Sequence, residues 1–173
     1  MEVEAKMPKA NAVRFDVDGS EIMSKILLEL LNDCPALGSR KIAFSTLGED
    51  DGLAFFPSVG AAITSEKESV TGHVRQVCAY PFDVVLRCAP KTEAARIRSK
   101  ELLDAIGRWL ERQPVTIGGK QYTMAEYPTL EEGTREIQAI SRTSPSHLNA
   151  VYQNGIEDWL FSGSLKYKNE FDR

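Results

Sequence analysis

The sequence predicts an α+β domain in which a mostly antiparallel sheet packs against two main helices. Two segments, one starting at Asp18 and one near Thr92, carry apolar side chains at helical spacing. Gly118-Gly119 separates two short strand-like runs, which is typical of a tight β-hairpin. Residues 136–168 then form a long block of strand-like sequence. Helices and strands grouped in this way favour an α+β arrangement.

The composition is that of an ordinary globular protein and argues against several functions. The chain has 173 residues, enough for one domain that folds without disulfides or metals. Its apolar share of 42% and charged share of 27% are typical of soluble domains. The net charge of −4 argues against wrapping of nucleic acid, which needs clustered lysine and arginine. It suits a surface past which DNA slides without sticking, because like charges repel.

Targeting and redox signals point to a soluble protein made in the cytoplasm. We expect no signal peptide and no contact with a membrane, because no apolar run has the required length. The cysteines Cys34, Cys78 and Cys88 are odd in number and widely spaced. This favours reduced thiols over a disulfide framework or a zinc site.

An N-terminal arm is expected to precede the first helix. Residues 1–17 are mixed polar and small, and we expect a flexible or partly disordered arm ahead of a single domain at 18–173. Asp18 is expected to cap the helix, with Glu21 as its capping-box partner. Apolar residues then recur on one face until about Asn32, and Pro35 ends the helix.

Strands and one loop are expected between the two helices. Residues 41–46 and 53–56 are short apolar runs around an acidic GEDDG turn and predict a hairpin. Residues 57–72 are small and charged, and we expect a long loop that is either functional or mobile. Residues 73–88 alternate and predict a long strand, in which Pro81 marks a bulge or an edge position.

The second helix is expected to begin at Lys91 or Thr92 and to end before Pro114. Acidic and basic residues three or four apart indicate a solvated outer face. Its expected buried stripe consists of Ala95, Leu102, Ile106, Trp109 and Leu110.

Strand signals dominate the rest of the chain. After the glycine hairpin, residues 135–142 alternate, with Ile137 expected to face away from Ile140. Residues 150–152 and 156–167 predict the last strands, turned at Asn154-Gly155.

The residues that could carry chemistry each have a structural explanation that fits better. His73 and Cys78 are the most plausible reactive pair, but five residues apart on one strand they point to opposite faces. His147 lies among hydroxyl residues without a nucleophile turn, so an exposed loop histidine is expected. We therefore expect no catalytic residue.

Three further motifs resemble ligand sites only superficially. Glu49, Asp50 and Asp51 lack the alternating oxygen ligands of a calcium loop. The glycine pair lacks the lysine and helix start of a phosphate loop. Asp16 and Asp18 resemble the paired carboxylates of phosphoryl-transfer enzymes, but no apolar strand precedes them, which favours capping. We expect no metal and no cofactor.

Two groups of residues are candidates for contact with a partner. Trp159, Phe161 and Tyr167 can line one face of the last strand; core packing is the first explanation and burial by a partner the second. The second group lies at the centre of the 57–72 loop, which we expect to meet a neighbouring subunit. The candidate interface residues are Glu66, Lys67, Glu68, Trp159 and Phe161.

Three segments carry a resemblance to a known family: LLDAIGRWLERQP at 102–114, YPTLEEGTREI at 127–137 and NGIEDWLFSGSLKYKNEF at 154–171. From about Ile22 onwards, the chain resembles the minor capsid or tail-terminator proteins of long-tailed phages and phage-tail-like particles of Gram-positive bacteria. The resemblance implies a helix-flanked sheet. It also implies a ring, usually of six copies, that stops polymerisation of the tail tube and joins the tail to the head or neck.

The implied function is that of a structural virion protein at the head-proximal end of a tail, made in the host cytoplasm. The implied partners are further copies of the chain, the tail tube protein and a neck or connector protein, with DNA passing through without specific binding. Another neck or head-closure minor capsid protein is a close alternative. A small enzyme using His73 and Cys78 and a monomeric ligand-binding module are alternatives from other classes.

Overall fold

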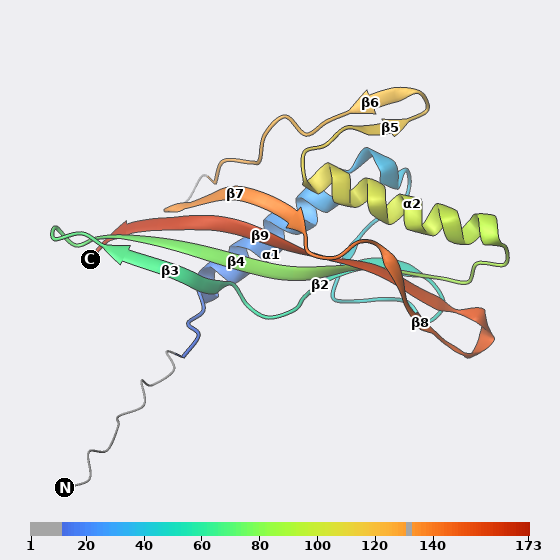
Figure 1. The fold of residues 1–173 in the computed structure, drawn as a ribbon, viewed down its shortest axis with the longest axis horizontal. Coiled ribbons are helices and arrows are strands. Elements are labelled where there is room, and N and C mark those ends of the chain that lie inside the picture. The colour runs from blue at the N-terminus through green and yellow to red at the C-terminus, as the bar shows by residue number, and fades with distance from the viewer. Residues whose placement is uncertain (1–11, 131–132) are drawn as a thin grey trace, which may run out of the picture.

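The computed structural model describes residues 12–130 and 133–173, which form one long sheet covered by helices (Figure 1). The elements are α1 (Val17–Asn32), β1 (Ala43–Phe44), β2 (Gly52–Pro57), β3 (Ala62–Glu68), β4 (His73–Cys88), α2 (Glu93–Leu110), β5 (Val115–Ile117), β6 (Lys120–Tyr122), β7 (Arg135–Arg142), β8 (His147–Val151) and β9 (Glu157–Asp172), with 3-10 turns at Pro35–Leu37 and Gln153–Gly155. Within the described residues, the main sheet has seven strands in the order β1-β2-β4-β9-β7, with β3 on β4 and β8 on β9. Apart from β1–β2, these strand pairs are antiparallel, so the predicted α+β fold is confirmed.

Two 16-residue strands, β4 and β9, form the centre of the sheet. They pair along their whole length, from His73 opposite Asp172 to Cys88 opposite Glu157. The other side of β4 is shared by β2 and β3, and the other side of β9 by β7 and β8. The predicted strand at 73–88 is therefore confirmed at both of its ends.

Pro81 lies at the point on β4 where one partner strand replaces another. The last residue of β4 that pairs with β3 is Ala79, and the first that pairs with β2 is Phe82. The proline falls between them, where no ladder hydrogen bond requires its missing N–H. Its carbonyl accepts a hydrogen bond from Ser58 as the chain crosses from β2 to β3. The predicted edge position is thus a local edge inside a central strand.

Both helices pack against the same face of β4 and β9. The even-numbered side chains of β4 from Val74 to Leu86 and the odd-numbered residues of β9 from Phe161 to Asn169 are buried. Because side chains alternate along a strand, these residues share one face, which we call the core face. The core face meets the helices through Met23, Leu27, Leu31, Leu103, Ile106 and Leu110. We call the opposite face of the sheet the outer face; neither α1 nor α2 covers it.

The N-cap of α1 is Asp16, not Asp18 as the sequence suggested. The carboxylate of Asp16 accepts a hydrogen bond of 3.1 Å from the backbone N–H of Gly19. Asp18 lies in the first turn and is exposed. The local capping pattern at Asp18 and Glu21 was misleading because Asp16 also bonds to residues of two distant strands, a contact that the pattern cannot reveal.

The predicted hairpin at 41–56 is wrong, because β1 pairs with β2 in parallel, with Ala43 opposite Ala54. Since β1 has two residues, the loop between the strands has to travel back only a short way, and a long crossover is not needed. The direction of β1 is set by Asn32, whose side chain bonds to both the N–H and the C=O of Ile42. The acidic GEDDG segment therefore belongs to a return loop.

The segment expected as a long loop, 57–72, contains the strand β3 (Ala62–Glu68). It pairs antiparallel with β4 from Ala62 to Glu68, with a bulge between Ile63 and Ser65. A short turn at Ser69–Gly72 then leads into β4. Most β3 side chains are exposed or half-buried, so the strand lacks the apolar alternation by which strands are recognised.

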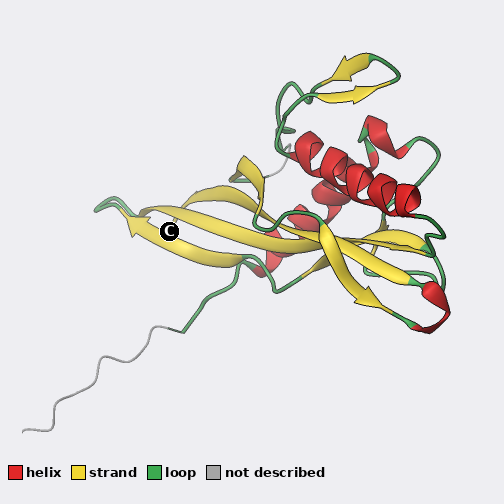
Figure 2. Ribbon diagram, turned by 45° about the vertical axis from the view of Figure 1, so that its right-hand side comes forward, coloured by secondary structure: helices red, strands yellow, loops and turns green. Residues whose placement is uncertain are grey.

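After α2, the glycine hairpin and β7 lie where they were predicted, whereas β8 covers 147–151 instead of 150–152 and β9 extends to Asp172 instead of ending at 167. Gly118 and Gly119 have φ angles of 59° and 79°, as a type I′ turn between β5 and β6 requires. This hairpin stands clear of the main sheet, beyond the end of α2 (Figure 2). A bulge between Ile137 and Ala139 lets both Ile137 and Ile140 face the core, whereas the sequence placed them on opposite faces.

The buried stripe of α2 agrees with the expected one at Ile106 and Leu110 but includes Leu103 in place of Leu102 and leaves Trp109 half-buried. Thr92 caps the helix as predicted, and Ile106 and Leu110 are buried. Leu103 is fully buried, whereas Leu102 and Trp109 are half-buried beside the core. Trp109 is nevertheless fixed, because its indole N–H donates a 2.9 Å hydrogen bond to the carbonyl of Leu30 on α1.

Candidate functional site

The reactive pair considered from the sequence is not assembled. Cys78 is fully buried on the core face, and burial raises the pKa of its thiol. His73 lies on the outer side at the start of β4, with ring contacts of 2.8 Å to Asp172 and 3.5 Å to Glu170. The hydrogen bond to Asp172 is the main cause of a raised His73 pKa. A histidine turned away from the thiol and occupied by carboxylates cannot activate it.

The other motifs also occupy structural positions. His147 is exposed at the start of β8, with its Nδ1 2.8 Å from the carbonyl oxygen of Pro145. Within residues 12–130 and 133–173, no three His, Cys, Asp or Glu side chains come together in a way that could hold a metal ion. In the same ranges, no helix has the length and apolar character needed to cross a bilayer.

Asp16 is the centre of a buried polar cluster that the sequence did not reveal. Its carboxylate receives hydrogen bonds of 2.7 and 2.9 Å from Arg135 on β7 and one of 2.7 Å from Tyr167 on β9. Burial would raise the pKa of Asp16, but these bonds and the one from Gly19 outweigh it and hold the pKa below its usual range. A carboxylate so fully engaged fixes the start of α1 against the sheet and is not free to act as a base.

The residues just before α1 add a short outer strand to β3. Phe15 forms an antiparallel bridge with Ala62. The N–H of Asp16 donates to Ala61 at 2.8 Å, and the N–H of Ile63 donates to the carbonyl of Arg14 at 2.9 Å. The last part of the predicted N-terminal arm is therefore paired with the sheet, whereas residues 1–11 lie outside the described residues.

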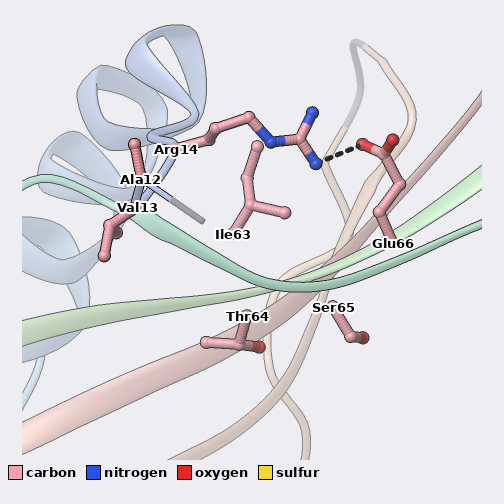
Figure 3. Close-up of a pocket in the computed structure, with 7 residues that line it drawn as sticks. All are labelled: Ala12, Val13, Arg14, Ile63, Thr64, Ser65 and Glu66. Atoms are coloured by element: carbon pink, nitrogen blue, oxygen red, sulfur yellow. Dashed lines mark ion pairs between the residues drawn. The ribbon is translucent and has the colours of Figure 1, made fainter. Parts of the chain in front are cut away.

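Beyond this bridge, the two chain segments diverge and leave an open groove of about 780 Å³ (Figure 3). One wall is formed by Ala12, Val13 and Arg14 and the other by residues 63–66. The guanidinium of Arg14 reaches over Ile63 to the carboxylate of Glu66, at 3.2 Å. From Thr64 to the end of β3, the outer edge of the strand carries no further strand in the described part of the chain.

The three charged interface candidates lie together on β3 rather than in a loop. Glu66 accepts a 2.6 Å hydrogen bond from Gln76, which is the main cause of its lowered pKa. Glu68 pairs with Arg173 at 2.9 Å, and Lys67 is exposed beside Arg75 on the outer face. The edge is thus charged, and its carboxylates are occupied by Gln76, Arg14 and Arg173, whereas Lys67 has no ion-pair partner among residues 12–130 and 133–173.

The two aromatic candidates differ in exposure. Phe161 is fully buried in the core, so its side chain is not available to a neighbour and its assignment to an interface is wrong. Trp159 is half-buried, and its indole N–H donates to Glu157 at 3.2 Å. Core packing, the first explanation of these aromatic residues, holds for Phe161 and Tyr167.

An exposed apolar surface adjoins the start of β3. A groove of about 540 Å³ runs between α1 and the ends of β1 and β2, with walls that are almost entirely apolar. Val17 and Phe44, both in its lining, are 76% and 46% exposed, and Phe15 beside Gly60 is 47% exposed. Apolar patches on a soluble protein often mark contact with another protein. The sequence could not reveal this patch because its residues come from separate elements.

No family model and no curated protein sequence matches the chain. Among solved structures, one similar chain comes from "Virion of native gene transfer agent (GTA) particle", with a TM-score of 0.47 and 8% sequence identity. The alignment covers 90% of this chain and 100% of that chain. A TM-score below 0.5 is too low to establish a shared fold.

Proposed function

We propose that this protein is a structural subunit of a phage tail or phage-tail-like particle, and specifically a tail terminator. Copies of the chain would form a ring, of six by the family resemblance, that caps the tail tube and joins it to the head or neck. The protein would act through surfaces and not through a reaction. The tail tube protein and a neck or connector protein would be its other partners.

The observation that carries this proposal is the combination of an open strand edge and an apolar groove on neighbouring parts of one surface. From Thr64 to Glu68 the outer edge of β3 carries no further strand among the described residues, and such edges readily pair with another chain. The apolar groove, which adjoins the start of β3, exposes Val17 and Phe44. A subunit that closes into a ring needs two different complementary surfaces, and an edge with an adjoining groove can provide one of them.

The segments that resemble the tail-terminator family pack against one another in this fold. The hydroxyl of Tyr127 donates to the carbonyl of Leu110 at 2.7 Å and accepts from the N–H of Ile140 at 3.2 Å. These contacts tie the end of α2 to the strand β7, which itself pairs with β9. The resemblance therefore falls on one packed unit of α2, β7 and β9, which supports a common scaffold more than scattered matches would.

The charge of the chain fits passage of DNA through such a ring. The net charge is −4, and a surface of the same sign as DNA does not retain it. Virion location at the head-proximal end of the tail follows from the same proposal.

The test is the mass and shape of the purified chain. Light scattering should give a particle several times the 19.2 kDa chain mass, and negative-stain electron micrographs should show rings. Phe44→Glu, in the groove, should shift the particle to monomers. Ile97→Glu is the matched control, because Ile97 is similarly exposed, at 54% against 46%, but lies on α2. A chain that stays monomeric at all concentrations, alone and with purified tail tubes, would overturn the proposal.

A further inference from the structure

The turn between β3 and β4 carries an apolar side chain directly into solvent. Val70 is fully exposed, and the turn that holds it, residues 69–72, projects at one end of the long sheet (Figure 1). Turns are usually built from Gly, Pro, Asn, Asp and Ser, each of which serves the turn backbone. A valine contributes nothing of this kind, so formation of the turn does not account for it.

The polar groups of this turn are already bonded within the chain. The N–H of Ser69 donates to the carbonyl of His73 at 2.9 Å, and the N–H of Gly72 donates to the carbonyl of Ser69 at 3.0 Å. The hydroxyls of Ser69 and Thr71 lie 2.8 Å apart, and the carbonyl of Gly72 accepts from the N–H of Arg173 at 3.0 Å. Polar groups that keep their hydrogen bonds cost little to bury, and a rigid turn loses little entropy on binding. The turn is therefore suited to enter an apolar groove.

The apolar groove beside α1 is prepared in the same way. The hydroxyl of Ser20 donates to the carbonyl of Asp16 at 3.0 Å and accepts from the N–H of Ala61 at 2.6 Å. The hydroxyl of Ser24 donates to the carbonyl of Ser20 at 2.8 Å and lies 2.6 Å from the hydroxyl of Tyr80. Because the hydroxyls in its lining are engaged, the groove offers a mostly apolar wall that binds an apolar side chain without breaking hydrogen bonds.

The turn does not reach the groove of its own chain. Gly60, two residues before β3, lines the groove, whereas the turn follows Glu68 at the other end of β3. A strand rises about 3.3 Å per residue, so β3 separates the two sites by roughly 20 Å. Pairing with β4 along this length prevents β3 from folding back. The turn is therefore available to another molecule only.

The charges around the turn and the groove are complementary. Lys67 leads into the turn, is exposed, and has no ion-pair partner in the described parts of the chain, 12–130 and 133–173. The rim of the groove is formed by α1, in which the carboxylates Asp18, Glu21 and Glu29 outnumber the single cation Lys25. Glu21 is 73% exposed and contacts Lys25 at 3.3 Å. Opposite charges at the rim of a contact favour the correct partner and speed its encounter.

We propose that the turn 69–72 of one copy inserts Val70 into the apolar groove between α1 and the ends of β1 and β2 of a second copy. Turn and groove are different surfaces, so the contact is heterologous, and repeated from copy to copy it links subunits head to tail into a ring or a filament. The inference rests on the proposed self-assembly. The groove is one of the two surfaces that a ring needs, and the turn supplies the other.

The direct test is a lysine-to-lysine cross-link in assembled wild-type protein. Lys67 lies three residues before Val70, and Lys25 lines the groove. When ¹⁵N-labelled and unlabelled copies are mixed before assembly, peptides that join Lys25 to Lys67 should combine a labelled with an unlabelled half. Peptides whose two halves always carry the same label would place the contact within one chain and overturn the inference. The absence of any link between these two lysines would also overturn it.

Removal of the apolar side chain provides a second readout. Val70→Ser should leave the chain folded, by circular dichroism, and raise the concentration needed for assembly by at least about tenfold, because the burial of a valine is lost. Val151→Ser in β8 is the matched control, since this valine is also exposed, at 63%, and its variant should assemble like wild type. Lys67→Glu should weaken assembly, and Glu21→Lys in the same chain should restore it.

The outcomes separate this inference from the proposed function. A Val70→Ser chain that assembles at the wild-type concentration would overturn the insertion of the turn and leave the proposed function standing. Normal rings of this variant that no longer hold purified tail tubes would assign the turn to the tube protein and equally overturn the inference. A wild-type chain that never assembles would overturn both.

Discussion

The hydroxyl of Tyr167 donates a 2.7 Å hydrogen bond to the carboxylate of Asp16, which joins the centre of β9 to the start of α1 across 151 residues of sequence. Arg135 of β7 completes the cluster with two further bonds to the same carboxylate. Asp16 is therefore helix cap and strand anchor at once. The same residue carries the backbone bond to Ala61, so this cluster also determines where the arm meets β3.

Loss of the Asp16 carboxylate should destabilise the fold strongly. Asp16→Asn would leave the guanidinium of Arg135, whose side chain is 14% exposed, without its counter-charge. Removing one partner of a buried ion pair costs on the order of 3 kcal/mol of unfolding free energy, measured by urea denaturation. The control is Tyr167→Phe, which removes one hydrogen bond and should cost about 1 kcal/mol. Equal effects of the two variants would show that the ion pair contributes little.

The same pair predicts how stability depends on pH. Asp16 has a folded pKa below its unfolded value of about 3.9, so its contribution is fully present above that pH and is lost as pH falls through the folded pKa. The difference in unfolding free energy between wild type and Asp16→Asn should therefore be constant near neutral pH and shrink below about pH 4. Other carboxylates cancel because both proteins contain them. A difference that stays constant down to pH 2 would contradict the assignment.

Gly163 is required by the packing of the core face. It lies in β9 directly opposite Phe82, and a Cβ at this position would approach the Phe82 ring to 2.7 Å. Gly163→Ala should cost about 1–3 kcal/mol of unfolding free energy, because a ring in the core has little room to move. Ser164→Ala is the neighbouring control on the outer face, where we expect a change within about 0.5 kcal/mol. An unchanged midpoint for Gly163→Ala would show that the ring relaxes.

An element could be predicted from the sequence where its signal lies within the element itself. The alternation of residues 73–88 identified β4 to both ends, and Gly118-Gly119 identified its hairpin, because both patterns are produced by neighbouring residues. The edge strand β3 was missed because both of its faces are largely open to solvent, so burial imposes no alternation on it. The parallel pairing of β1 was missed because Asn32, far away in α1, holds Ile42 in place.

The candidate site was predictable only in part, for the same reason. Glu66, Lys67 and Glu68 were identified as an exposed charged group, but their place on a strand edge depends on the pairing with β4. The Asp16 cluster brings together residues from three elements, and nothing local to any of them shows that they meet. A register slip such as the bulge at Ile137 likewise depends on a neighbouring strand and is invisible in the alternation alone.

Trp109 should be a stability determinant that acts through both packing and a hydrogen bond. Trp109→Ala should cost about 3 kcal/mol of unfolding free energy, at the lower end for tryptophan because the ring is half-buried. Trp109→Phe keeps most of the ring contacts but loses the bond to Leu30, so it should cost about 1 kcal/mol. If the phenylalanine variant were as unstable as the alanine variant, the indole N–H would be the dominant contribution.

Assembly should tolerate loss of both residues of the reactive pair considered from the sequence. Cys78→Ser should cost about 1–2 kcal/mol of unfolding free energy, because it places a hydroxyl in the core, yet leave the particle mass in light scattering unchanged.

His73→Gln should also leave the particle mass unchanged. Because Asp172 raises the folded pKa of His73, the stability that this pair provides is present below the unfolded pKa and lost as pH rises through the folded one. The stability difference between wild type and the variant should therefore be largest below about pH 6.5, the unfolded pKa of histidine, and should shrink as pH rises through the folded pKa. Loss of assembly by either variant while it remains folded would mean that the pair has a role beyond structure.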